Sequence, residues 1–67
     1  MDYAVRVRGH LGKATRQAFV DLQVETRGSD TVLSGSLPDQ SALHGLLALI
    51  ESLGLELLDV RRLPSGV

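Results

Sequence analysis

Several residue types are scarce in this chain of 67 residues, and each shortage excludes a class of protein. Cysteine is absent, which excludes a disulfide framework and a thiolate metal site. Tryptophan is also absent, and a single phenylalanine and a single tyrosine leave the predicted core aliphatic. No apolar run approaches the roughly 20 residues that a membrane span needs. We therefore expect one small domain with no metal, no cofactor and no membrane partner.

An excess of basic charge is missing as well. Seven basic residues stand against eight acidic ones, for a formal net charge of −1. Nucleic-acid binding usually requires a basic excess, so we expect no nucleic-acid partner. The first six residues have neither a basic start nor a long apolar core, and therefore do not resemble a signal peptide. These features predict a cytoplasmic protein.

The stretch from Pro38 to Gly54 predicts the main helix. Asp39 occupies the position of an N-cap, directly after a proline that ends the preceding segment. Gly54 follows the last apolar residue, where a glycine in the left-handed conformation often ends a helix. The apolar face is predicted from helical spacing and consists of Leu43, Leu46, Leu47, Ile50 and Leu53.

The same stretch resembles a signature of short, uncharacterised bacterial proteins. Their pattern is Asp-Gln-x-x-Leu-His-Gly-Leu-Leu, followed after a gap by Leu-Gly-Leu-x-Leu-x-x-Val. Here the two parts fall at residues 39–47 and 53–60. Residues 16–22 loosely resemble an aromatic-rich segment of the same proteins, but without its tryptophans. The resemblance implies a fold-level relationship and no known activity.

Alternation of apolar and polar residues predicts four strands, at residues 3–8, 20–27, 31–37 and 55–63. A short helix is expected at residues 13–19, and residues 64–67 are expected to form a flexible tail after a single α+β domain at 1–63. This order predicts a ferredoxin-like βαββαβ fold, with two helices on one face of a four-stranded antiparallel sheet and the first and third strands central. The order also resembles an ACT domain, and residues 22–63 resemble the end of a BON domain.

Few side chains could carry out chemistry. His10 and His44 are the only histidines, and the helical neighbours of His44 are Gln40, Ser41, Leu47 and Ala48, none of which is a strong metal ligand. His44 could therefore be a surface residue, a subunit contact or, least expected, catalytic. Asp39 could act as a general base, but a helix cap is the expected role. We predict no catalytic, cofactor-binding or metal-binding residue.

Three surfaces could instead bind a protein. Arg6 and Arg8 should lie on the sheet face away from the helices, with Asp21, Gln23 and Glu25, as a solvated face or a docking surface. Ser41, Gly45, Ala48 and Ser52 form a stripe of small residues that could pack on the short helix or on another subunit, with His44 at its rim. In the last strand, alternation puts Leu55 and Leu57 on one face and Leu58 and Val60 on the other, so some leucine must be exposed. The predicted interface residues are His44, Gly45, Ala48, Leu55, Leu57, Arg6 and Arg8.

These features favour a non-catalytic interaction or oligomerisation module over an enzyme. A domain of this size buries only about 60% of its unfolded surface, so we expect a homodimer or a complex with a larger protein. The alternative is an ACT-like regulatory domain that binds a small ligand at a subunit interface. A third possibility is an enzyme whose site is completed by two chains, with His10, His44 or Asp39 contributing.

Overall fold

The computed structural model describes residues 1–64, which form a two-layer domain measuring 33 × 24 × 19 Å. The last three residues of the predicted tail, 65–67, lie outside the described residues. In chain order the elements are β1 (Asp2–Arg8), α1 (Lys13–Arg16), the 3₁₀ helix η1 (Gln17–Phe19), β2 (Gln23–Arg27), β3 (Asp30–Ser36), α2 (Gln40–Ser52) and β4 (Leu57–Leu63).

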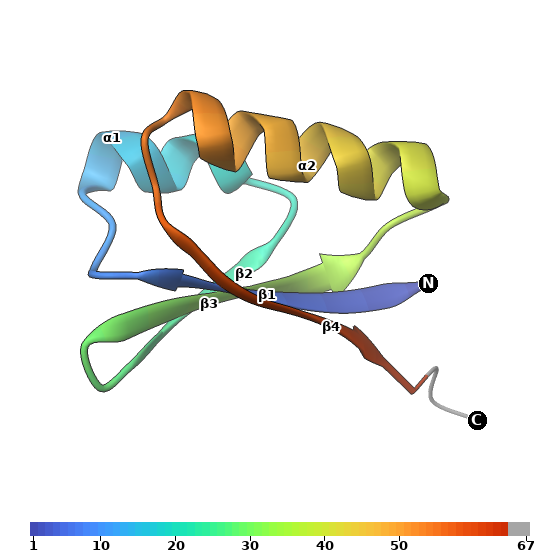
Figure 1. Ribbon diagram of the computed structural model, residues 1–67, viewed down its shortest axis with the longest axis horizontal. Coiled ribbons are helices and arrows are strands. Elements are labelled where there is room, and N and C mark those ends of the chain that lie inside the picture. Colours follow the sequence, from blue (N-terminus) through green and yellow to red (C-terminus); the bar gives the residue numbers. More distant parts are fainter. Residues whose placement is uncertain (65–67) are drawn as a thin grey trace.

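The four strands form one antiparallel sheet in the order β2-β3-β1-β4. The first and third strands are therefore central, as predicted. Both helical segments lie on the same face of the sheet, and the other face is uncovered (Figure 1). The predicted α+β class, with an antiparallel sheet covered on one side by helices, is confirmed.

The core lies between the sheet and the helices. Alternate residues of the two central strands point into it, because side chains on a strand alternate between faces. Val5 and Leu33 lie opposite each other in the register of β1 and β3, as do Val7 and Thr31, and all four are buried. Phe19 from η1 and Ile50 from α2 close the core from above. Thr31 is polar but fully buried, and its hydroxyl donates a hydrogen bond to the Gly9 carbonyl at 2.6 Å.

Both ends of α2 form as the sequence predicts. The Asp39 carboxylate accepts a hydrogen bond from the Ala42 N–H at 2.9 Å, which satisfies a donor that the first turn leaves free. Gly54 has a φ of 74°, in the left-handed region that favours glycine. The chain reverses there, and the N–H groups of Gly54 and Leu55 bond back to the carbonyls of Glu51 and Ile50 at 3.0 and 3.2 Å.

This reversal corrects the predicted apolar face of α2. Ile50 is buried, and Leu46, Leu47 and Leu49 pack against the core, but Leu53 is 41% exposed. Leu53 is the C-cap residue, so the helix has ended before its side chain could continue the buried row. Leu55, on the far side of the reversal, packs against the core instead.

Two strands begin later than predicted. Residues 17–19 form a 3₁₀ helix, and a turn follows in which the Leu22 N–H donates a hydrogen bond to the Phe19 carbonyl at 3.0 Å. Because this turn includes residues 20–22, β2 starts at Gln23 rather than at Val20. Because Val20 lies in this turn, it is exposed. Residues 55 and 56 belong to the chain reversal after α2, where the Leu55 N–H bonds to the Ile50 carbonyl, so β4 starts at Leu57 instead of Leu55.

A bulge near the start of β4 overturns the predicted alternation in this strand. Asp59 is paired with Arg6 of β1, but the next residue of β1, Val7, is paired with Leu57, which leaves Leu58 as the extra residue. Val60 is paired with buried Val5 and Leu57 with buried Val7, so both lie on the helix-covered side of the sheet. Without the bulge they would lie on opposite faces.

Candidate interaction surface

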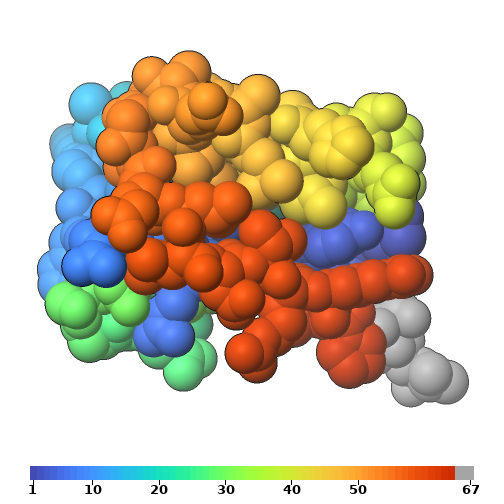
Figure 2. All heavy atoms as spheres, viewed as in Figure 1, coloured from blue at the N-terminus to red at the C-terminus, as the bar shows by residue number. Residues whose placement is uncertain are grey.

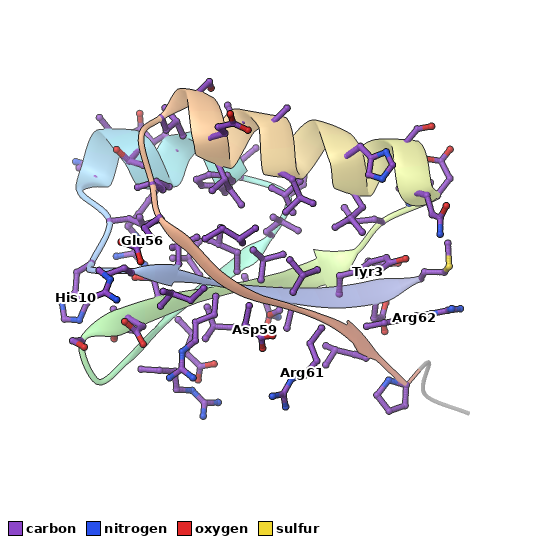
Figure 3. All side chains as sticks on the ribbon, viewed as in Figure 1. Tyr3, His10, Glu56, Asp59, Arg61 and Arg62 are labelled. Carbon is purple, nitrogen blue, oxygen red and sulfur yellow. The ribbon has the colours of Figure 1, made fainter. Side chains whose placement is uncertain are left out.

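The polar side chains singled out by the sequence do not gather into a reactive site. His10 lies in the loop after β1, with Nε2 at 2.8 Å from the Gly28 carbonyl, at the end of the molecule opposite the start of α2 (Figures 1 and 3). His44 is exposed on the first half of α2, and the Asp39 carboxylate caps the same helix. Over residues 1–64, no three histidine or acidic side chains are placed so that they could hold a metal ion.

The stripe of small residues on α2 faces outward. Ser41, Gly45, Ala48 and Ser52 are all exposed. A Cβ placed on Gly45 would meet no atom within 4 Å, so no backbone among residues 1–64 approaches the helix closely there. Gly45 lines the same hollow as Ala18 and Phe19 of the short helical segment without a close backbone contact, and packing of the rest of the stripe stays a prediction. The subunit contact predicted for Gly45, Ala48 and His44 stays a prediction.

Charged side chains occupy the uncovered face of the sheet, as predicted for Arg6 and Arg8. Arg6 is paired with Asp30 at 3.2 Å, Arg8 with Glu56 at 3.3 Å and Arg61 with Asp59 at 3.4 Å. Asp59 and Arg61 both point away from the helices (Figure 3). Exposed pairs of this kind contribute only about 0–1 kcal/mol each. Gln23 and Glu25 share the face, but Asp21 lies in the turn before β2 and so is not on it.

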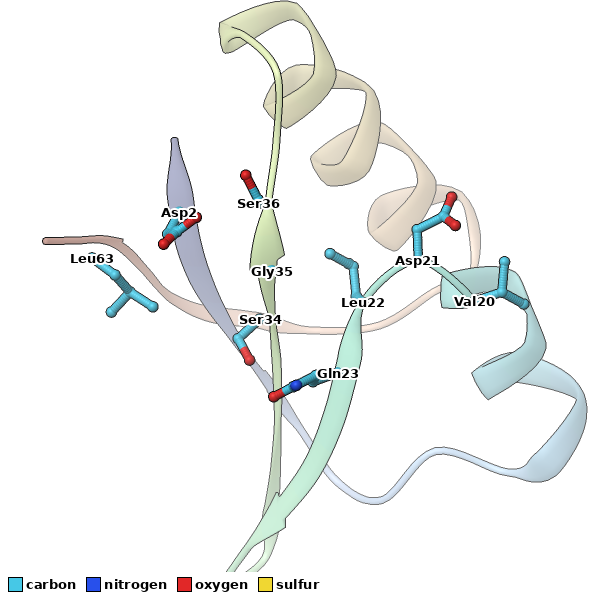
Figure 4. Close-up of a pocket in the computed structure, with 9 residues that line it drawn as sticks. All are labelled: Asp2, Val20, Asp21, Leu22, Gln23, Ser34, Gly35, Ser36 and Leu63. Carbon is cyan, nitrogen blue, oxygen red and sulfur yellow. The ribbon is translucent and has the colours of Figure 1, made fainter. Parts of the chain in front are cut away.

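A hollow of about 480 Å³ opens at one end of the sheet (Figure 4). Its lining includes the carboxylates of Asp2 and Asp21 but no basic side chain. Leu22 lies close to the β3 backbone here, because a Cβ on Gly35 would be 2.7 Å from the Leu22 Cδ2 atom. Glycine at position 35 therefore lets the turn before β2 approach β3. Its two carboxylates come from separate parts of the fold, Asp2 from β1 and Asp21 from the turn before β2.

The two edges of the sheet differ sharply in character. The β2 edge is five residues long, with four exposed polar side chains, Gln23, Glu25, Thr26 and Arg27. The β4 edge is seven residues long, and its side chains include Leu57, Leu58 and Val60, which are 44%, 37% and 37% exposed. In the space-filling view β4 runs uncovered across the near face of the molecule (Figure 2). Of the predicted interface residues of the last strand, Leu57 is exposed and Leu55 packs against the chain's own core.

Backbone groups are also exposed along β4. The Arg8 N–H bonds to the Glu56 carbonyl at 3.0 Å, while the Gly9 N–H bonds to Ser29 on the other side of β1. Even-numbered residues of β1 therefore direct their N–H and C=O groups toward β4, because these groups alternate along a strand. The residues of β4 that pair with these β1 residues, among them Asp59 and Arg61, direct their own N–H and C=O groups toward β1. Val60 and Arg62 alternate with them, so the N–H and C=O groups of Val60 and Arg62 point outward from the sheet.

A family model described as a domain of unknown function (DUF8691) matches residues 2–61, which run from the start of β1 into β4. This agrees with the expected relationship to uncharacterised proteins, while the Asp-Gln-x-x-Leu-His-Gly-Leu-Leu signature stays a prediction. No curated protein matches the chain, and no solved structure does. Within residues 1–64, neither helix has the length and apolar character needed to cross a membrane.

Proposed function

The chain belongs to the DUF8691 family, and we propose that it is a non-catalytic interaction domain that forms a homodimer through the β4 edge of its sheet. The observation that carries this proposal is the combination, on one strand, of outward-directed backbone groups and three exposed apolar side chains, Leu57, Leu58 and Val60. Such a strand is a template for pairing with another chain.

The contrast with the other edge supports the choice of β4. Folded proteins protect edge strands by keeping them short and polar or by covering them. β2 has both of the first two features, whereas β4 is longer and carries three exposed apolar side chains beside its charged residues. Two-fold pairing of like chains is the commonest closed assembly, and a domain of this size gains stability from it. A second copy is therefore the proposed occupant of the β4 edge.

The non-catalytic part of the proposal is supported by where the polar residues lie. His10 and His44 belong to separate parts of the fold, and the Asp39 carboxylate is engaged by the Ala42 N–H. A general base needs a reacting group within hydrogen-bond reach, and the polar contact of the His10 ring is with a backbone carbonyl, that of Gly28. A cytoplasmic location remains an expectation from the sequence.

We also propose the ferredoxin-like assignment of the fold. It is supported by the strand order read from the other edge, β4-β1-β3-β2, in which each helix-containing connection joins two strands that are separated by one other strand. A split βαβ arrangement has connections of this kind, which supports the proposal. It leaves β4 and β2 as the two edges, and β4 is the longer one and carries the exposed apolar side chains.

Light scattering at micromolar to millimolar concentration tests the proposed dimer. We expect a mass that rises toward that of two chains with concentration. Leu57→Lys should shift the mass toward one chain, because a charge would be desolvated in the contact. Ala48→Lys is the matched control, since it adds the same charge to the exposed face of α2. A single-chain mass for the unmodified protein throughout would refute the dimer, and a shift caused by Ala48→Lys alone would move the contact to α2.

A further inference from the structure

The sequence of β4 restricts how two copies could pair along this edge. When two identical strands pair antiparallel about a two-fold axis, opposed side chains point to the same face of the sheet. The axis must therefore pass through a residue position, and the residue at that position lies opposite the same residue of the other copy. For β4 the three residues nearest the middle are Asp59, Val60 and Arg61. Each defines a different register.

Charge distinguishes these registers. An axis at Asp59 would oppose two carboxylates, and an axis at Arg61 would oppose two guanidinium groups. An axis at Val60 instead places Asp59 of each copy opposite Arg61 of the other, twice over. Opposite charges directly across a strand pair stabilise it, and like charges destabilise it. Asp59 and Arg61 both lie on the uncovered face of the sheet, where no helix would obstruct the pairs (Figure 3).

Backbone geometry agrees with the axis at Val60. Since Val60 directs its N–H and C=O outward, two copies of Val60 would exchange a pair of hydrogen bonds at the axis. Asp59 and Arg61 would then form the pairs without mutual backbone bonds, in which opposed side chains approach most closely. Val60 is also the midpoint of Leu57–Leu63. Because the bulge puts Leu57 on the helix-covered side and Leu63 on the other, the regular part of this register runs from Leu58 to Arg62.

Building on the proposed homodimer, we infer that two copies pair antiparallel through β4 with the two-fold axis at Val60, and that reciprocal Asp59–Arg61 ion pairs between the copies select this register. The two sheets then join into one eight-stranded sheet, with all helices on the same side. The partner surface is a second copy of this chain, recognised by alternating charge around an apolar centre.

Charge reversal followed by mixing tests this register. Asp59→Arg alone and Arg61→Asp alone each oppose like charges twice across the axis, so each variant should dissociate roughly tenfold or more readily than the unmodified chain. An equimolar mixture should form a heterodimer, because every charge introduced in one variant then faces an opposite charge in the other. Sedimentation velocity with one variant carrying a size tag distinguishes the heterodimer from the homodimers.

The mixing step separates the proposed contact from effects within one chain. Each variant loses its own Asp59–Arg61 pair, which measures 3.4 Å, and mixing cannot restore it. Both side chains are about half exposed or more, so the variants should fold, and circular dichroism checks this. Arg62→Asp is the control, because Arg62 would lie opposite Leu58 rather than opposite a charge.

The possible failures have different meanings. If the unmodified chain stays a single chain at all concentrations, the proposed function is wrong together with the register. If it dimerises but both charge variants dimerise equally well, or if mixing restores nothing, the register alone is overturned. Equal weakening by Arg62→Asp would also overturn it, since the effect would then follow net charge instead of position.

Discussion

Phe19→Ala is expected to lower the free energy of unfolding by about 3–5 kcal/mol. Phe19 is the only phenylalanine, it is 3% exposed, and it lies in the core with Val5, Val7, Leu33 and Ile50. Phe19 is the buried side chain of residues 13–19, because none of the four residues of α1 is buried. Removing the ring therefore leaves a cavity and detaches residues 13–19 from the sheet. Urea unfolding followed by circular dichroism measures the loss.

The adjacent residue provides the control for this change. Val20 is 77% exposed, and Val20→Ala removes apolar atoms from the same turn without opening a cavity. Its effect should be within about 0.5 kcal/mol, as for surface positions generally. Equal effects of the two substitutions, or an unchanged unfolding midpoint for Phe19→Ala, would mean that η1 is not the anchor of the short helix.

Ile50→Ala is expected to cost about 2–5 kcal/mol, from lost burial and a cavity between α2 and the sheet. Ile50 is 1% exposed and is the buried residue of the main helix. Its carbonyl also accepts the bond from the Leu55 N–H that closes the reversal after α2. A chain of this length has a total stability of about 3–10 kcal/mol, so this loss is a large share of it and the unfolding midpoint should fall clearly.

Leu53→Ala on the same helix is the matched control for Ile50→Ala. Leu53 is of similar size but belongs to the exposed C-cap position, so its removal should cost much less. Thermal unfolding of the two variants side by side is sufficient to compare them. If Leu53→Ala proves the more damaging, the apolar face of α2 extends to its end, as helical spacing alone predicts, and the orientation of the helix described here is wrong.

Local rules predicted the parts of the fold that depend on nearby residues. The cap at Asp39, the reversal at Gly54 and the alternation in β1 each follow from interactions within a few positions along the chain. The late starts of β2 and β4 could not be read in the same way. Residues 20–22 alternate like a strand, but the 3₁₀ turn ending at Phe19 places its ring in the core and uses those residues to close the turn.

The exposed apolar residues of the last strand were predicted only in outline. Exposed leucine in the last strand followed from alternation, since one face of the sheet is uncovered. Which residues are exposed depends on the bulge between Leu57 and Asp59, which results from pairing with β1 and has no glycine or proline to mark it. The exposed position of Gly45 likewise depends on the distance between α2 and its neighbours, and sequence spacing carries no information about that distance.

The central claim, that β4 pairs with a second copy, is tested most directly by amide hydrogen exchange of the unmodified protein at low and high concentration. The account predicts that the Val60 and Arg62 amides, which point outward from the sheet, exchange rapidly in dilute solution and slow as concentration rises. The Asp59 and Arg61 amides, directed toward β1, should exchange slowly at every concentration and serve as internal controls. Exchange at Val60 and Arg62 that stays rapid at millimolar concentration would contradict the claim.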